Sequence, residues 1–392
     1  MTRVGSLGAY DRFNYGDLLF PHLLDRAATE ANSVEFLHFA VRAADLSRLG
    51  GVEVQGSKAL SRMLTRRGND SQEGLAGLVL GGGEVGGATW GQAATSLSPF
   101  PVDRGLAAVR RRIGARAQDR LGRLLLQGRW PTPYIPDESV VGGAFTLTSN
   151  AIGVSSIANL DDATRVAVAR TLSKARYLSV RDQDSVQALR RHGVGSQLAP
   201  DSAAALRMVH PNPVTEPRDG LVFQCSLDWM RRHGSGALDA LAEVAGRFAA
   251  LRLLPIGLAG GHSDQSALAA LRTRLHQRGI RNAVLETATT TWQIADAIAR
   301  AEVFVGTSLH GAITSMAYGT PHVTLAGIRK LDAYMTTWGD GLTPTGVAPE
   351  ALSSAVQSAL RISKLALSAR AERLSALAWA STLRAIEAAS AR

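Results

Sequence analysis

Short apolar segments alternate with longer amphipathic segments along most of this 392-residue chain. This rhythm is typical of strands and helices that build parallel sheets. In the first half it predicts strands at Val34–Phe39, Leu75–Leu80, Phe145–Val154 and Tyr177–Val180, and helices over Asp17–Glu30 and Asp184–His192. In the second half it predicts strands at Leu221–Ser226, Leu251–Ile256, Val284–Thr287, Val303–Val305 and His322–Leu325, and helices over Ala237–Ala250, Gln265–Gly279, Trp292–Arg300 and Ala312–Tyr318. We therefore expect an α/β protein with two Rossmann-like domains and a ligand cleft at the carboxyl ends of the strands.

The proline-rich stretch His210–Pro217 separates the two halves. Proline suits neither a helix interior nor a central strand, so we place a linker at 209–219. The expected domains are 1–208, on the side of the acceptor, and 220–362, on the side of the donor. Residues 363–392 read as a last helix that can return to the first domain.

The charge balance indicates acidic partners. Lys and Arg number 43 against 33 Asp and Glu, a net charge of +10, and such an excess favours phosphorylated metabolites, anionic lipid headgroups or nucleic acid. An arginine-rich solvated surface with no partner is the plainer explanation. Only 5% of residues are aromatic, so the stacking platforms of single-stranded nucleic-acid binders are missing and we expect no nucleic-acid partner. A basic nucleic-acid binder stays the third alternative.

The chain has one cysteine, Cys225, which excludes a disulfide framework and a cysteine zinc site. Met1–Gly8 lacks the apolar core of a signal peptide, and no apolar stretch approaches the ~20 residues of a membrane span. We expect a cytoplasmic enzyme that needs no metal and no cofactor.

Two glycine-containing turns of the first half are candidate walls of the cleft. In Asn14-Tyr-Gly-Asp17, Gly16 permits a turn with positive φ and Asp17 can cap the next helix. The run Gly81-Gly-Gly-Glu-Val-Gly-Gly87 follows a predicted strand, and its glycines can let a ligand approach the backbone. The residues after it open a helix weakly, so we reject a dinucleotide site and keep Gly82, Gly83 and Glu84 as cleft wall.

Two further segments place cations at predicted strand ends. Arg181 follows the last apolar residue of one strand, and Asp182 can orient it or cap the next helix. Asp182-Gln-Asp184 also matches the D-x-D of metal-dependent sugar transferases, but at a helix start capping is the commoner explanation. The block Gly306-Thr-Ser-Leu-His-Gly311 sets His310 at the start of a helix, where the dipole favours anions. Arg329 and Lys330 follow the next strand.

Together these motifs resemble the polysaccharide pyruvyl transferase family. The matching positions are Asn14, Gly16, Asp17, Gly81–Gly83, Arg181, Asp182, Asp201, Ser308–Gly311, Gly319 and Pro321. The resemblance implies a glycosyltransferase-B-like pair of domains. It also implies transfer of the enolpyruvyl unit of phosphoenolpyruvate to sugar hydroxyls of a cell-envelope polysaccharide, glycolipid or lipid-linked oligosaccharide, giving a pyruvate ketal and phosphate.

On that pattern the donor is held by Arg181, Ser308, His310, Gly311, Arg329 and Lys330. His310, Arg181 and Asp17 are the expected catalytic residues, with Asp17 or Glu84 as the base. Many family members carry arginine where this chain has Ser308. The alternative is a nucleotide-sugar glycosyltransferase of the same architecture, using Glu286 or the pair Asp182 and Asp184.

An arginine-rich segment lies outside these motifs. Arg104–Arg129 contains eight arginines and one acid, Asp119, beside an apolar stripe at helical spacing. The stripe comprises Leu106, Val109, Ile113, Ala117, Leu121 and Leu124, and an aromatic loop with Trp130 and Tyr134 follows. One interpretation is a surface helix that docks on the anionic inner face of the membrane. The plainer one is a helix with its stripe in the core and its arginines in water.

Overall fold

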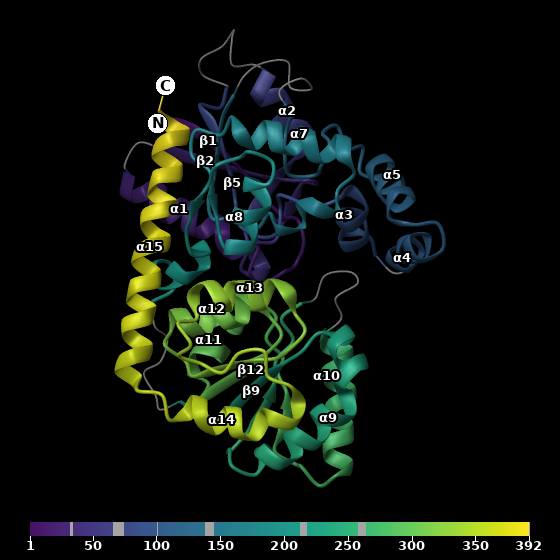
Figure 1. Cartoon of the computed structure of the whole chain (residues 1–392), viewed down its shortest axis with the longest axis vertical. Helices are drawn as coiled ribbons and strands as arrows, with labels where there is room; N and C mark the ends of the chain where they lie inside the picture. The colour runs from purple at the N-terminus through teal and green to yellow at the C-terminus, as the bar shows by residue number, and fades with distance from the viewer. Residues whose placement is uncertain are drawn as a thin grey trace.

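The chain forms two lobes, each built on its own sheet (Figure 1). The structure is a computed structural model that describes residues 1–31, 34–65, 74–99, 101–137, 145–211, 218–257 and 264–391. The sheet of the first lobe has the order β3-β4-β2-β1-β5-β6, and the sheet of the second has the order β11-β10-β9-β12-β13. All pairings in both are parallel except that of β3 with β4. The predicted α/β fold with two Rossmann-like halves is confirmed.

The elements of the first lobe run to Met208. Its strands are β1 (Thr2–Leu7), β2 (Val34–Ala40), β3 (Ala44–Asp45), β4 (Glu53–Gly56), β5 (Gly77–Leu80), β6 (Thr146–Ser149) and the small pair β7 (Ser179–Val180) and β8 (Gln197–Leu198). Its helices are α1 (Leu19–Ala31), α2 (Ser57–Thr65), α3 (Trp90–Leu97), α4 (Val102–Arg112), α5 (Ala115–Leu125), α7 (Asp162–Ser173) and α8 (Gln183–Arg190). The short 3-10 turns are η1 (Ser47–Leu49), η3 (Ser155–Asn159) and η4 (Ser202–Met208).

The second lobe begins at Leu221. Its strands are β9 (Leu221–Gln224), β10 (Leu251–Leu253), β11 (Ala283–Leu285), β12 (Val303–Gly306) and β13 (His322–Thr324). Its helices are α9 (Leu227–Ala245), α10 (Asp264–Gln277), α11 (Thr291–Arg300), α12 (Leu309–Ala317), α13 (Arg329–Trp338) and α14 (Leu352–Leu360), with the turn η5 (Pro349–Ala351) before α14. None of the described helices is long and apolar enough to cross a bilayer.

The central strands match the sequence pattern because both of their faces are covered. Every residue of β5, β9 and β12 is buried, and strands of this kind appear in sequence as continuous apolar runs. The pattern missed β1, whose Gly5 and Ser6 interrupt the apolar run, and it missed α7. It also treated the residues after Gly87 as a weak helix start, which was wrong. Thr89 caps α3 there through a capping box with Gln92.

The strand order reverses at one place in each sheet. The chain passes from β1 outward to β2 on one side and to β5 on the other, and β9 lies in the same way between β10 and β12. Loops at such a switch point diverge and leave a crevice at the carboxyl ends of the strands. The loops after β1, β5, β9 and β12 carry most of the candidate residues. The predicted linker at 209–219 lies mostly outside the described residues.

The last helix, α15 (Lys364–Ser390), runs from the second lobe along the side of the first (Figure 1). Its backbone lies directly on β5, because a Cβ added to Gly77 would come within 2.3 Å of the Ala389 carbonyl oxygen. Thr148 of β6 donates to the Ala385 carbonyl at 3.0 Å, and the Asn150 amide donates to Thr382 at 3.1 Å. The helix thus links the two lobes covalently and by packing.

The arginine-rich segment is not one helix. Gly114, with a φ of 111°, separates α4 from α5, a backbone conformation that a side chain makes unfavourable. The predicted apolar stripe is therefore divided: Leu106 is buried, whereas Ile113 and Leu124 are 73% and 74% exposed. The interpretation of the aromatic loop as a surface feature is also wrong, because Trp130 and Tyr134 are buried in the core of the first lobe.

Packing of α15 on the first lobe can be tested with a pair of matched substitutions. Ile386 is buried and Leu377, on the same helix, is 44% exposed. We expect Ile386→Ala to lower the free energy of unfolding by about 3 kcal/mol, because it leaves a cavity. Leu377→Ala should change it by less than about 1 kcal/mol. Urea unfolding followed by circular dichroism measures both, and equal losses would contradict the described packing.

Candidate functional site

Arg181 lies in a buried ion network of the first lobe. Its guanidinium donates to Glu84 Oε2 at 2.7 Å, and its Nε lies 3.5 Å from a carboxylate oxygen of Asp182. Asp182 also caps α8 by accepting from the Ser185 amide at 2.7 Å, so both roles foreseen for it are combined. Because the Arg181 side chain is only 1% exposed, its charge is balanced inside the protein.

Asp201 joins this network to the second lobe. Its Oδ2 lies 3.8 Å from Arg181 Nη1 and 3.7 Å from His310 Nε2. The carboxylate is fully buried, and the Asp201 side chain begins η4 by accepting from the Ala203 amide at 3.0 Å. Arg181 and His310 therefore meet around one carboxylate, although they come from different lobes.

Electrostatics keep Glu84 and Asp201 ionised. Burial by itself would raise the pKa of Glu84, but Arg181 and the donors of Ser155 and Ser156 outweigh it, and the pKa is lowered. Burial would likewise raise the pKa of Asp201, but His310 and Arg181 hold it below its usual range. Glu84 Oε1 accepts three hydrogen bonds, from Ser155 Oγ and from the amide and hydroxyl of Ser156. A carboxylate with these partners is a weak base, contrary to one expectation for Glu84.

Gly16 brings the first lobe against the His310 ring. A Cβ at this glycine would lie 1.9 Å from the imidazole, so the residue is required for close approach. Its φ is outside the positive range, which corrects the predicted turn. Asp17 does not cap α1 as expected. It accepts from the Asn14 amide at 2.7 Å and lies against Gly83, whose φ is 78°.

The glycine run after β5 is packed, not open to a ligand. The glycines from Gly81 to Gly83 are buried. Added Cβ atoms would meet the Tyr10 hydroxyl at Gly81 and the Phe20 ring at Gly82. The Phe20 ring in turn lies edge-on to His310, with centroids 5.7 Å apart. These glycines shape the wall behind His310, and the expected approach of a ligand to their backbone is wrong.

Gln224, at the end of β9, holds the start of the helix that carries His310. Gln224 Oε1 accepts from the amides of Thr307 and Ser308 at 3.1 and 2.8 Å, and its Nε2 donates to Asp264 at 2.9 Å. Ser308 caps α12 by accepting from the Gly311 amide at 3.1 Å. The first turn of α12 is thereby oriented with its positive dipole end toward the space between the lobes.

A pocket of about 390 Å³ opens between the lobes at this helix start. Its lining includes Arg12 and Asn14 of the first lobe and Ser308, His310 and Lys330 of the second. Arg12 is held in place by donating to Asp11 at 3.1 Å and to the Tyr134 hydroxyl at 2.9 Å. The pocket thus presents cationic groups from both lobes, which suits an anionic ligand.

Lys330 lies in a crowded part of this cleft. Its side chain reaches solvent, yet protein atoms surround the ammonium group and, by desolvating it, lower its pKa. The charge of Arg181 lowers the pKa further, while Asp17, Glu84 and Asp264 oppose the shift. A bound anion would stabilise the charged form of Lys330, because it would offset both the desolvation of the ammonium group and its repulsion by Arg181.

Two expected donor residues lie elsewhere. Arg181 is buried behind the pocket and does not line it. Arg329 points away, with a side chain that is 74% exposed and lies 3.9 Å from Asp184 at the surface. Glu286, considered for a sugar-nucleotide enzyme, forms an ion pair with Arg252 at 3.1 Å. Within the described ranges, no group of three or more acidic, histidine or cysteine side chains could hold a metal ion.

The lining of the pocket also includes residues that the sequence motifs did not indicate, among them Arg12, Gln224 and Asp264. Arg12 stands two residues before Asn14, so the turn after β1 already contained the signal. Gln224 ends β9, and polar residues at the carboxyl end of a buried strand are frequent ligand contacts. The sequence predicts that a helix begins beside Asp264, but only the fold shows that this helix start lies at the pocket.

One part of the chain is similar to a known protein family. Residues 140–327 match the polysaccharide pyruvyl transferase family. The resemblance inferred from the motifs is confirmed, and with it the assignment of the chain as a transferase. The match includes Arg181, Asp182, Asp201 and the block from Ser308 to Gly311. No curated protein sequence matches the chain.

Solved structures share the two-lobed fold at low sequence identity. UDP-GlcNAc 2-epimerase from Methanocaldococcus jannaschii is 11% identical with a TM-score of 0.56, covering 92% of this chain and 93% of that chain. The S. aureus MnaA–UDP co-structure is 8% identical with a TM-score of 0.53, covering 96% and 91%. The Neisseria meningitidis UDP-GlcNAc 2-epimerase bound to UDP-GlcNAc is 8% identical with a TM-score of 0.50, covering 99% of each chain. At this identity the comparison establishes the glycosyltransferase-B-like fold alone.

The charge on Asp201 can be tested by Asp201→Asn. Its pKa is below the ordinary value of 3.8 in the folded protein, so its stabilisation is present above that pH and is lost as the pH falls through the folded pKa. We expect the variant to be less stable by about 3 kcal/mol at pH 7, with a difference that shrinks as the pH falls below 3.8. Urea unfolding across this pH range measures it.

Asp239→Asn is the matched control, because Asp239 forms an exposed ion pair with Arg278. It should change stability by less than about 1 kcal/mol at any pH. If Asp201→Asn were as mild as this control, Asp201 would not hold the two lobes electrostatically.

Proposed function

We propose that the protein transfers the pyruvyl unit of phosphoenolpyruvate to a sugar acceptor and releases phosphate. The observation that carries the proposal is the pocket in which Arg12, Lys330, His310 and the start of α12 converge from two lobes. Phosphoenolpyruvate combines a carboxylate with a phosphate, and a phosphate monoester carries about −1.5 to −2 charges at pH 7. A pocket for such a donor needs several fixed cations, and this one has them.

In the proposed complex, the donor lies over the first turn of α12. The amides of Leu309 and His310 follow the Ser308 cap, and groups in that position bind phosphate or carboxylate oxygens. Arg12 suits the planar carboxylate because its guanidinium can contact both oxygens, while Lys330 serves as a point charge for the phosphate. Ser308 stands where many family members carry arginine. Arg12 supplies a guanidinium from the opposite lobe.

The proposed reaction begins with proton transfer from His310 to the methylene carbon of the donor. This leaves a positively charged centre at the carbon that bears the phosphate. A sugar hydroxyl forms a bond to that carbon and gives its proton to a base, and the C–O bond to phosphate breaks. A second hydroxyl of the same sugar then closes the ketal. One donor and one diol thus give one pyruvate ketal and one phosphate.

Asp201 is the group that positions His310 for this step. The two lie at ion-pair distance, and His310 Nε2 has no hydrogen-bond partner in the described part of the chain. Asp17 is a better base for the sugar hydroxyl than Glu84, because Glu84 is occupied by four hydrogen bonds. Arg181 acts through Asp201 and Glu84, without touching the donor.

The alternative function is that of a nucleotide-sugar glycosyltransferase, which is compatible with the same fold. The residues suggested for it are engaged in other contacts, since Glu286 pairs with Arg252 and Asp184 lies at the surface beside Arg329. One assay separates the two functions. With a candidate acceptor, pyruvyl transfer releases phosphate from phosphoenolpyruvate, whereas glycosyl transfer releases a nucleotide from a sugar nucleotide.

Adjacent residues provide a matched test of the donor pocket. We expect Lys330→Ala to raise the KM for phosphoenolpyruvate at least tenfold, because it removes a cation that faces the pocket. Arg329→Ala should leave KM unchanged, since its side chain points to Asp184. His310→Ala should lower kcat more than tenfold with little effect on KM. Phosphate release measured over a range of donor concentrations gives all three values, and a larger effect of Arg329→Ala than of Lys330→Ala would contradict the pocket.

We also propose that α4 and α5 bring the enzyme to an anionic membrane that carries its acceptor. The two helices lie at the outer edge of the first lobe, on the side away from α15 (Figure 1). Four large apolar side chains are exposed on them: Val102, Ile113, Leu124 and Leu125. Arginines surround these side chains, with three in the last turn of α4 alone. Exposed apolar groups among cations are the pattern of peripheral binding to anionic lipid.

Vesicle flotation tests the membrane contact. The protein should float with vesicles of phosphatidylcholine and phosphatidylglycerol but not with phosphatidylcholine alone, because the arginines need anionic headgroups. Replacing Ile113 and Leu124 by Ser should lower the bound fraction about tenfold, since their side chains would enter the interface. The control is Val166→Ser with Leu365→Ser, which removes two apolar side chains that are 65% and 80% exposed elsewhere. Equal recovery of the three proteins, or equal binding to both vesicles, would refute the contact.

A further inference from the structure

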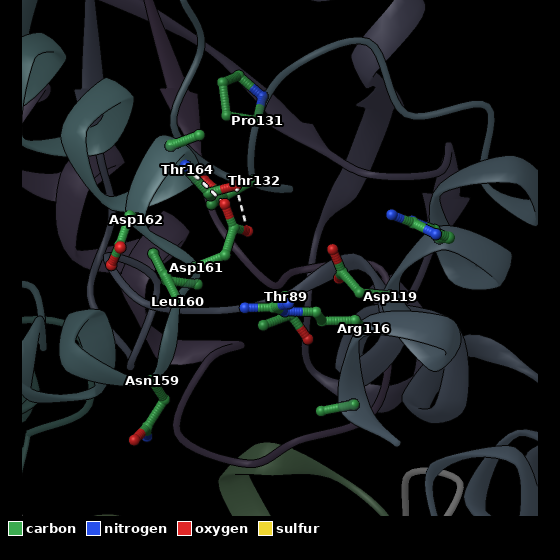
Figure 2. Close-up of a pocket in the computed structure, with 13 residues that line it drawn as sticks. Thr89, Arg116, Asp119, Pro131, Thr132, Asn159, Leu160, Asp161, Asp162 and Thr164 are labelled. Atoms are coloured by element: carbon green, nitrogen blue, oxygen red, sulfur yellow. Dashed lines mark hydrogen bonds between the residues drawn. The ribbon is translucent and has the colours of Figure 1, made fainter. Parts of the chain in front are cut away.

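The first lobe contains a second cavity, of about 650 Å³, apart from the pocket at α12 (Figure 2). Its size is within the range of small-molecule sites. One wall is α5, and the other is the segment from the end of η3 to the start of α7. The remaining lining comes from Thr89, before α3, and from Pro131 and Thr132. None of these residues belongs to the donor pocket.

Thr132 gives this cavity an unmet hydrogen-bonding group. The residue is only 1% exposed, and its hydroxyl has no partner among the described residues. Figure 2 labels it among the residues that line the cavity. A buried hydroxyl without a partner costs about 1–3 kcal/mol, and native proteins retain few of them. Its oxygen has almost no accessible surface, so the side chain has to rotate toward the cavity for the hydroxyl of a ligand to satisfy it.

The charges of the cavity exclude simple ions as ligands. Its lining has the guanidinium groups of Arg116 and Arg120 and the carboxylates of Asp119, Asp161 and Asp162. Three carboxylates disfavour a phosphate, and two guanidinium groups disfavour a cation. Alternating donors and acceptors instead suit a neutral molecule with many hydroxyls, each of which can donate and accept.

Two of the acids are oriented by contacts within the protein. Asp161 accepts hydrogen bonds from the amide and the hydroxyl of Thr164, and these two bonds lower its pKa. Asp119 accepts from the Gly91 amide at 3.0 Å through Oδ1. Each carboxylate is thus fixed in direction before a ligand binds, which lowers the entropy cost of recognition.

The cavity connects to the catalytic network through η3. Ser155 and Ser156 at the start of η3 hold Glu84, the partner of Arg181, and Asn159 at its end lines the cavity. The loop after β5 is fixed to the same turn, because a Cβ at Gly87 would lie 2.3 Å from the Ser156 hydroxyl. Thr89 of the lining follows this loop directly. A ligand in the cavity would therefore lie beside the wall that positions Glu84 and Arg181.

We infer that this cavity binds a neutral sugar unit of the acceptor chain. The assignment of the cavity to the acceptor rests on the proposed pyruvyl transfer. Its preference for a neutral saccharide follows from the lining residues alone. The unit bound here lies outside the donor pocket, so it is a neighbour of the sugar that receives the pyruvyl group. Its hydroxyls bind Thr132 and Asn159, and its ring oxygen and remaining hydroxyl oxygens accept from Arg116 and Arg120.

The test uses the full-length protein and an array of neutral oligosaccharides of glucose, galactose, mannose and N-acetylglucosamine. The affinity for the best ligand is then measured by calorimetry. We expect Thr132→Val to raise the Kd at least tenfold without lowering the melting temperature, because it removes an unsatisfied hydroxyl and keeps the shape. If Thr132 had a purely structural role, the substitution would lower the melting temperature and leave the Kd unchanged. Arg120→Ala should also raise the Kd at least tenfold.

The matched controls lie outside the cavity. Thr273→Val changes an exposed threonine whose hydroxyl donates to Ala269 in α10, and Arg112→Ala removes an exposed arginine of α4. Both should leave the Kd unchanged. Retention of no neutral oligosaccharide, preference for anionic ones, or equal Kd values for wild type and Thr132→Val would each overturn the inference. Saccharide binding lost in Thr132→Val without any phosphate release from phosphoenolpyruvate would instead uphold the cavity and reject pyruvyl transfer.

Discussion

The buried carboxylate of Asp201 lies between two side chains that the sequence separates by 129 positions, Arg181 and His310. A buried charge is costly unless it is paired, and here each group compensates the others. Neither contact is a short hydrogen bond, and Arg181 Nε, Asp201 Oδ2 and His310 Nε2 all lack hydrogen-bond partners in the described chain. The network is electrostatic, and it requires the two lobes to stay within a narrow distance of each other.

Contacts around this network keep that distance. The Tyr15 hydroxyl of the first lobe lies 2.7 Å from the Thr314 hydroxyl of α12, and the Trp338 indole donates to the Arg181 carbonyl at 2.7 Å. Gly16 allows the His310 ring to lie against the backbone of the first lobe. The return of α15 adds a packed connection on the far side. Because so many contacts cross the interface, the position of His310 depends on the whole arrangement.

The two cavities differ in a way that matches their proposed ligands. The donor pocket has guanidinium, ammonium and imidazole groups and a helix start, so it favours a multiply charged anion. The cavity of the first lobe balances two arginines with three aspartates and contains an unsatisfied hydroxyl. The ion network lies between them. Two cavities of different charge are expected in an enzyme that binds both a small charged donor and a large neutral acceptor.

Strands buried on both faces and capped helices could be predicted from the sequence because local composition decides them. The motifs around Arg181 and His310 also indicated the family. The tertiary structure decided the rest: Arg181 became a buried positioning group, Arg329 faced solvent, Arg12 entered the pocket, and the basic segment broke at Gly114. The physical reason is that burial and charge pairing depend on neighbours far along the chain. The sequence determines which groups are available, but only packing decides which of them still has a free charge to offer a ligand.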